Sequence, residues 1–287
     1  MNTNALTVSG LTKKYKDFTL SDISFAVPQG TIVGLIGENG AGKSTIMSAI
    51  LGLIHKDAGA ITIFGKHEQE IDFSTRNQIG VVFDHGNFPE GLTPKALNGL
   101  LKNVFPSWDE ALYFSSLKKI SLPTDQKIKT FSKGMKMKLA IVVSISHHAR
   151  LLILDEPTSG LDPIVRDDIL DLFLDFVQSE EHSILVSSHI TSDLEKIADY
   201  IVFIHEGRLV FSKPKEELLE SYGIVKCGAA QFAALDKKDM IAYRKQDYGW
   251  QVLVADRNTA KKKYPNAVIV PATIDEIMLL YIKGEQQ

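Results

Sequence analysis

Short apolar runs alternate with amphipathic segments between residues 31 and 199 of the chain. Helical patterns are predicted to begin at Lys43, after Pro163 and at Thr191. Continuous apolar runs are typical of strands that are buried on both faces, and their alternation with helices predicts a mostly parallel sheet. The expected fold class is therefore α/β, with helices covering the sheet. The predicted strands read TIVGLIG, QIGVVF, LLILD and SILVSS.

Residues 86–148 follow a different pattern from the segments on either side. They lack strong strand runs and contain three stretches of helical periodicity. This region is predicted to be a helical insertion between two strands of the sheet. The stretches are PKALNGLLKNVF, WDEALYFSSLKKI and KGMKMKLAIVVSI.

The pattern changes again after residue 219. A hairpin is predicted around a Tyr-Gly turn, followed by the strand AVIVPA and a closing helix, TIDEIMLLYIKG. We predict two domains: residues 1–219 and a small α+β domain of residues 220–287. A dimer contact and a regulatory role are both open for the second domain.

Composition narrows the class of protein. The 287 residues are 44 % hydrophobic and 23 % charged, which is ordinary for a globular protein. The net charge of −3 argues against a general nucleic-acid binder. Cys227 is the single cysteine, so no disulfide can form within the chain. The sequence shows no signal-peptide pattern and no run of about 18 apolar residues, so we expect no membrane crossing.

The stretch GENGAGKST follows an apolar strand and opens a helix, which is the setting of a phosphate-binding loop. Glycines let the backbone wrap a phosphate chain, and the helix N-terminus adds its dipole. Lys43 is expected to reach the β- and γ-phosphates, and Ser44 to ligate Mg²⁺. The alternative is a glycine-rich turn that matches by chance, which the strand and helix context disfavours. The ATP-binding residues expected here are Gly37, Glu38, Asn39, Gly40, Ala41, Gly42, Lys43, Ser44 and Thr45.

Two adjacent carboxylates end the strand in LLILDEPTSGLD. Asp155 lies at the carboxyl end, where ligands bind in open α/β sheets, and suits Mg²⁺. Glu156 is expected to polarise a water for attack on the γ-phosphate. Two adjacent buried carboxylates are costly without a cation or a proton, which argues against a purely structural role.

A second anion site is predicted in TFSKGMKMKLAI, far along the chain from the first. Ser132 reads as the cap of a helix and Gly134 lies in its first turn. Free N–H groups at such a helix start favour an anion.

In this order, the motifs resemble the nucleotide-binding subunit of an ABC transporter over residues 4–215, a P-loop NTPase fold. FSKGM is similar to the signature motif and SGLD to the D-loop. The residues of this signature motif also resemble those of bacterial exporter-type (ABC-2-like) cassettes that handle drugs or antimicrobial peptides. The residues that the resemblance adds are Tyr15 against adenine, the switch histidine His189, Ser159 and Asp162 in the D-loop, and Ser132, Lys133, Gly134 and Met135 in the signature.

The resemblance implies an ATPase that uses ATP and Mg²⁺ and powers export of an unknown substrate. Glu156, His189 and Lys43 would be its catalytic residues. It implies two partners. One is a second cassette, identical or not, whose ATP meets the signature of this chain. The other is an integral membrane permease, for which helical residues 86–130 would offer a docking groove beside Asp84. The expected location is the cytoplasmic face of the membrane, or the cytosol when isolated, with no nucleic acid bound. The alternative is a non-transport ABC ATPase acting in translation, repair or assembly.

The chain departs from the family pattern at two positions. Lys133 replaces the first glycine of the signature, either as a solvent-facing side chain or as a cation near phosphate. Asp84 stands where the family usually has glutamine. It either ligates Mg²⁺ through its carboxylate or merely starts a turn.

Overall fold

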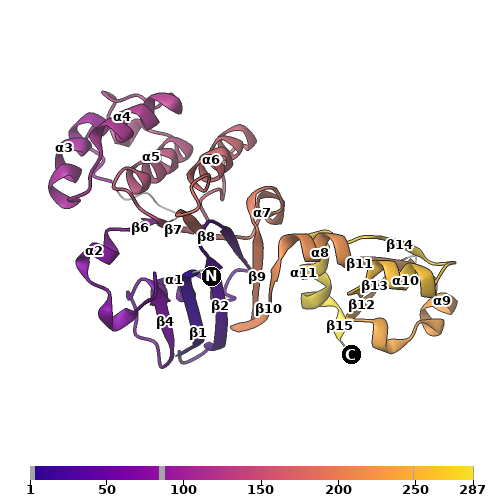
Figure 1. Ribbon diagram of the computed structural model, residues 1–287. Helices are drawn as coiled ribbons and strands as arrows, with labels where there is room; N and C mark the ends of the chain where they lie inside the picture. Colours follow the sequence, from indigo (N-terminus) through magenta and orange to yellow (C-terminus); the bar gives the residue numbers. More distant parts are fainter. Residues whose placement is uncertain (1–3, 84–87, 248, 287) are drawn as a thin grey trace.

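The computed structural model describes residues 4–83, 88–247 and 249–286 and contains two β-sheets. The larger sheet has ten strands in the order β5-β4-β1-β2-β10-β9-β3-β8-β7-β6. The smaller sheet has five, in the order β14-β11-β13-β12-β15. The two sheets lie in separate parts of the molecule, with the helical insertion above the larger one (Figure 1).

Parallel strands form one half of the large sheet, as the apolar runs predicted. Four parallel pairings join β6, β7, β8, β3 and β9 in that order. Every residue of β3 and β8 is buried, which explains the absence of alternation in their sequences. These strands are β3 (Ile32–Ile36), β6 (Ile79–Val82), β7 (Leu151–Asp155), β8 (Ser183–Ser188) and β9 (Tyr200–His205).

The other half of the sheet is mostly antiparallel, and the sequence patterns used above did not predict it. β1 pairs antiparallel with β2 and β4, and β10 joins β2 to β9. Along β2, buried residues alternate with more exposed ones, which is the pattern of a strand with one covered face. The strands are β1 (Asn4–Lys14), β2 (Thr19–Pro28), β4 (Ala58–Ile63), β5 (Lys66–His67) and β10 (Arg208–Pro214).

Helices α1, α6 and α7, which flank the parallel strands, begin at or next to the predicted residues, whereas α2 was not predicted. Those of the large sheet are α1 (Lys43–Ile50), α2 (Phe73–Arg76), α6 (Pro163–Phe176) and α7 (Thr191–Ile197), with the 3-10 turn η1 (Glu68–Glu70).

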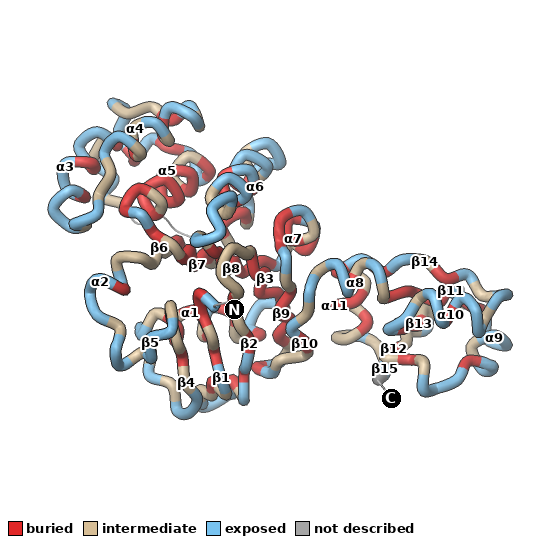
Figure 2. The backbone as a smooth tube through the Cα atoms, in the orientation of Figure 1, coloured by how far each residue is buried: buried red, intermediate tan, exposed pale blue. Residues whose placement is uncertain are grey.

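All three predicted helices of the insertion are confirmed: α3 (Pro94–Val104), α4 (Glu110–Lys119) and α5 (Lys133–Ile145), with the turn η2 (Ile128–Thr130). Thr93, Asp109 and Ser132 cap them through side-chain oxygens. The helices share a core around Tyr113, which is fully buried. α5 is the most buried of the three, and α3 and α4 expose their outer faces (Figure 2).

The C-terminal part contains the predicted hairpin, strand and closing helix. β12 and β13 form the antiparallel hairpin, and β11 lies between β13 and β14. The division at residues 219 and 220 remains a prediction. Its elements are α8 (Lys215–Ser221), β11 (Gly223–Cys227), α9 (Ala229–Ala234), η3 (Lys237–Asp239), β12 (Ala242–Gln246), β13 (Gly249–Val254), α10 (Arg257–Lys263), β14 (Val268–Pro271), α11 (Ile274–Lys283) and β15 (Glu285–Gln286).

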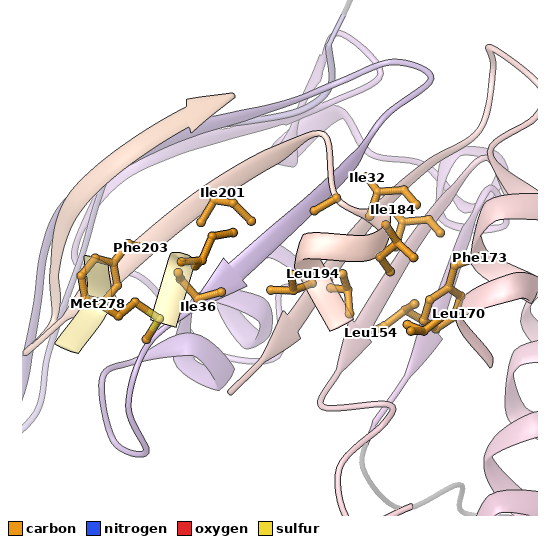
Figure 3. Packing of buried hydrophobic residues seen from close by; sticks show 14 of the residues in the cluster. Ile32, Ile36, Leu154, Leu170, Phe173, Ile184, Leu194, Ile201, Phe203 and Met278 are labelled. Carbon is orange, nitrogen blue, oxygen red and sulfur yellow. The ribbon is translucent and has the colours of Figure 1, made fainter. Parts of the chain in front are cut away.

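One hydrophobic cluster runs from the large sheet into the C-terminal part. It includes Phe203 of β9, Met278 of α11 and Phe173 of α6, which Figure 3 labels. Leu194 of α7 is part of the same cluster. The C-terminal part is therefore packed against the large sheet by apolar contacts and not merely tethered to it.

Candidate functional site

Three loops meet at the carboxyl edge of the parallel strands. β8 lies between β3 and β7, so the residues that follow these three strands are neighbours. The register pairs Ile36 with Ser188 and Asp155 with Ser187. This arrangement brings together the phosphate loop after β3, Asp155 and Glu156 at the end of β7, and His189 after β8.

Glycine gives the phosphate loop a path that other residues cannot follow. Gly42, at the N-cap of α1, has φ 110°, in the left-handed region that favours glycine. At Gly37 the backbone passes so close to β9 that a Cβ atom would lie 2.4 Å from the carbonyl oxygen of Ile204. The loop therefore presents backbone groups where side chains would otherwise stand.

Lys43 is a buried lysine at the start of α1, with 6 % of its surface exposed. Its Nζ donates a hydrogen bond to the carbonyl oxygen of Gly37 at 2.8 Å and lies 3.5 Å from Glu156 Oε1. A buried ammonium needs such partners because an unpaired charge is costly there. The lysine is thus held between the phosphate loop and the carboxylate that follows β7.

Glu156 lies between the lysine and the histidine. Its other carboxylate oxygen, Oε2, is 2.6 Å from His189 Nδ1. Glu156 has φ 51°, an uncommon value for a residue other than glycine, and backbone conformations of this kind cluster at functional sites. The structure therefore brings all three predicted catalytic residues into one chain of contacts.

Asp155 is surrounded by hydroxyl groups. Ser44 Oγ donates to Asp155 Oδ2 at 2.9 Å, and Ser187 Oγ donates to Oδ1 at 2.5 Å. A hydroxyl and a carboxylate are oxygen ligands of the kind that Mg²⁺ prefers, so this pair fits the ion. The sequence analysis missed Ser187, although its place two residues before His189 at the end of a predicted strand was a usable signal.

Tyr15 lies in the turn between β1 and β2, with 46 % of its surface exposed. Its backbone N–H donates to the carbonyl of Phe18 at 2.8 Å. A Cβ atom on Gly42 would lie 3.0 Å from the Phe18 ring, so this turn borders the phosphate loop. Phe18 is a second aromatic residue beside the loop that the sequence analysis did not single out.

The predicted second anion site has the expected helix start. Ser132 Oγ accepts a hydrogen bond from the backbone N–H of Met135 at 3.2 Å and so caps α5. The start of α5 lies close against α6, because a Cβ on Gly134 would be 2.6 Å from Val165. Asp162 caps α6 in turn by accepting from the N–H of Val165.

Lys133 reaches across to the segment before α6. Its Nζ donates to the carbonyl oxygen of Ser159 at 2.9 Å. One turn further along α5, Lys138 Nζ donates to Asp168 Oδ2 at 2.5 Å. Together with the close approach at Gly134, these contacts define a seam between α5 and residues 159–168. Asp84, the second position at which the chain differs from the family pattern, lies outside the residues that the structure describes.

The signature residues Ser132 and Gly134 are separate from the phosphate loop, although Lys133 is connected to Glu156 through the backbone of Ser159. Within the parts of the chain that the structure describes, no hydrogen bond links Ser132 or Gly134 to the phosphate loop. In Figure 1, α5 lies among the upper helices, apart from α1. The chain thus presents two separate candidate phosphate sites.

An apolar hollow of about 530 Å³ lies near the end of α1. Its lining includes Leu53 and Phe83, which expose 62 % and 40 % of their surfaces, together with Ile54, Ile71 and Ile79. Solvent-exposed apolar residues gathered in one hollow are typical of a binding surface.

None of the helices in the described part of the chain combines the length and apolar character that a membrane span requires.

Comparison with known proteins gives concordant matches. A family model described as "ABC transporter" matches residues 20–159. The lantibiotic transport ATP-binding protein SrtF of Streptococcus pyogenes is 36 % identical over 211 residues, covering 72 % of this chain and 90 % of that protein. The bacitracin transport ATP-binding protein BcrA of Bacillus licheniformis is 34 % identical over 214 residues, covering 72 % and 69 %.

A solved structure agrees with the sequence matches. CbiO1 of Clostridium perfringens, part of an ABC transporter complex, superposes with a TM-score of 0.66 at 25 % identity. The superposition covers 75 % of this chain and 90 % of that one.

Proposed function

The chain belongs to the ATP-binding subunits of ABC transporters, a family of ATPases, and from this premise we propose that it hydrolyses ATP to drive export through a separate membrane subunit. The observation that carries the proposal is the contact chain from Lys43 through Glu156 to His189 at the edge of the sheet. A role in transport is supported by the relatives of the chain, which are transport ATP-binding proteins for a lantibiotic and for bacitracin, and export is the direction that we propose.

The residues that follow the strand ends bind the phosphates and the metal ion. Lys43 and the backbone N–H groups of residues 37–45 bind the phosphates. Ser44 and Asp155 would hold Mg²⁺, which neutralises phosphate charge when bound.

The attacking water is oriented by Glu156. As the water oxygen forms its bond to the γ-phosphorus, the bond to the bridging oxygen breaks and Glu156 accepts the proton. His189, in contact with the same carboxylate, fixes its direction. Tyr15, beside the loop, stacks on adenine.

The signature residues serve the ATP of a partner cassette. Ser132 and Gly134 present a helix start to an anion yet make no hydrogen bond to the phosphate loop of their own chain, within the described residues. A second cassette placed head to tail would bring its own phosphate loop to them. Ser159, which is bonded to Lys133, and Asp162, the cap of the neighbouring helix α6, would lie at that interface too.

Loss of the Lys43 ammonium tests the phosphate site. Lys43→Ala should weaken ATP binding by about 10- to 100-fold, because a charge-assisted contact contributes about 1.5–3 kcal/mol. Isothermal titration calorimetry with ATP measures the affinity. Lys56→Ala, which removes a lysine paired with Glu68 outside the loop, is the control and should bind normally. An unchanged affinity for Lys43→Ala would contradict the phosphate role.

A membrane subunit is proposed to dock on the apolar hollow, which is lined by residues between Ala49 and Phe83. The predicted groove in 86–130 stays a prediction. Leu53→Asp should reduce recovery of a polytopic membrane protein about tenfold when the tagged chain is purified from detergent-solubilised membranes, because a charge in an apolar contact is costly. Quantitative mass spectrometry measures the recovery.

Val268→Asp is the matched control, because Val268 exposes 61 % of its surface and Leu53 exposes 62 %. Equal recovery with both variants would place the docking surface elsewhere. Recovery of ribosomes or DNA in place of a membrane protein would favour the non-transport alternative.

A further inference from the structure

Helix α7 lies between the reaction site and the C-terminal part of the chain. It begins at Thr191, two residues after His189. At its other end the backbone N–H of Ile274, the first residue of α11, donates to Glu195 Oε1 at 2.8 Å. The helix that follows the switch histidine is therefore bonded directly to the closing helix of the chain.

Glu195 also joins α7 to a second helix, α8. Its backbone carbonyl also accepts a hydrogen bond from Lys215 Nζ, at 2.9 Å, at the start of α8. A carboxylate beside the first N–H groups of a helix is favourable because it faces the positive end of the helix dipole. Ile274 is fully buried, so water cannot replace Glu195 as the partner of its N–H group.

Apolar contacts reinforce the same connection. Leu194 and Ile197 of α7 belong to the hydrophobic cluster that includes Ile277 and Met278 of α11 (Figure 3). These four side chains are at most 8 % exposed. Since interiors of this kind are close-packed, α7 cannot shift without moving α11 or opening a cavity.

On its other face α7 is joined to α6. Lys196 Nζ donates to Asp167 Oδ1 at 3.0 Å, and Arg166 lies beside Asp193 with 3.8 Å between Nε and Oδ2. The helix is thus held on two sides, by α6 and by α11, immediately after the residue that contacts Glu156.

We propose that Glu195 is a positioning residue of the ATPase reaction: by binding the N-terminus of α11 it fixes α7 and so holds His189 against Glu156. The C-terminal part then acts on the rate of hydrolysis through this helix. The inference rests on the proposed roles of Glu156 and His189. A displacement of about 1 Å at a catalytic group is enough to lower a rate substantially.

Steady-state ATPase measurements on the full-length chain test the role. Glu195→Ala should lower kcat by about fivefold and leave KM for Mg-ATP unchanged, because the phosphate loop is not touched. Glu195→Asp has a shorter side chain that cannot keep the hydrogen bond to the N–H of Ile274, so its kcat should fall by a similar factor. This variant replaces Glu195→Ala as the test if the alanine variant folds poorly. Glu195→Gln retains Oε1 as an acceptor and should restore most of the activity.

Glu276→Ala is the matched control. Glu276 Oε2 accepts from the backbone N–H of Thr273 at 3.0 Å, so its loss weakens the same helix start without removing a contact to α7. Its kcat should stay at the wild-type value. An equal fall in both variants would show that only the stability of α11 matters and would overturn the proposal.

A second measurement separates an effect on His189 from one elsewhere. In a His189→Ala background, Glu195→Ala should lower the residual hydrolysis no further, because both changes disable the same group. The same fivefold fall in this background, or a wild-type kcat for Glu195→Ala alone, would refute the inference. Failure of the proposed function is a distinct outcome, because the wild-type chain itself would then show no ATP hydrolysis.

Discussion

Replacing Glu156 with glutamine is expected to leave Mg-ATP bound and to slow hydrolysis by about 10²-fold or more. The physical reason is the place of the carboxylate. Glu156 contacts Lys43 and His189 but lies outside the loop that wraps the phosphates. Glutamine has nearly the same shape and keeps an oxygen toward His189, but it cannot accept the proton of the attacking water.

Release of radiolabelled phosphate measures the rate, and calorimetry measures the affinity. Glu181→Gln is a suitable control because Glu181 also pairs with a basic residue, Arg150, away from the site. That variant should hydrolyse ATP normally. If Glu156→Gln also hydrolysed ATP at the wild-type rate, Glu156 would have no part in proton transfer.

Mixing two inactive variants is expected to restore ATP hydrolysis. Ser132→Arg would block the signature of one protomer, and Lys43→Ala would disable the phosphate loop of the other. Each variant alone forms dimers without a competent site. In a mixed dimer both lesions fall on one composite site, and the second site keeps an intact loop and an intact signature.

The expected recovery is up to about half of the wild-type activity per mixed dimer, if each site turns over independently. Hydrolysis is measured for wild type, for each variant and for the mixture over a range of protein concentrations. Thr130→Arg is the matched control for the new arginine, since Thr130 is exposed and precedes the cap of α5. Wild-type activity that is independent of protein concentration would rule out a shared site.

Strong sequence patterns located most of the parallel half of the sheet. LLILD and SILVSS became β7 and β8 because continuous apolar runs of this length fit strands buried on both faces. Ser132 was placed correctly at the cap of α5, since a hydroxyl before a helical pattern is a local signal. The resemblance named His189 as the switch histidine, but its contact with Glu156 depends on the adjacency of β7 and β8, which the sequence analysis did not give.

Features that depend on tertiary packing were not predicted. The antiparallel strands β1 and β2 were missed, although they form a hairpin and buried residues alternate with more exposed ones along β2. Register shifts interrupt the pairing of β1, and the turn between the strands has no Asn-Gly or Asp-Gly pair to mark it. Neither the bond from Ile274 to Glu195 nor the contact of Lys133 with Ser159 has a signature in sequence spacing. Both join residues that are brought together only when the helices pack.

The seam between α5 and residues 159–168 has a consequence for how force passes through the molecule. Lys133, Gly134 and Lys138 attach the signature helix to the segment that begins at the D-loop. A displacement of the helical insertion is therefore expected to move the signature and the D-loop together. If each loop contacts a different nucleotide of the proposed dimer, a force applied by the membrane subunit acts on both nucleotides together. Hydrolysis at the two sites would then be coupled in time.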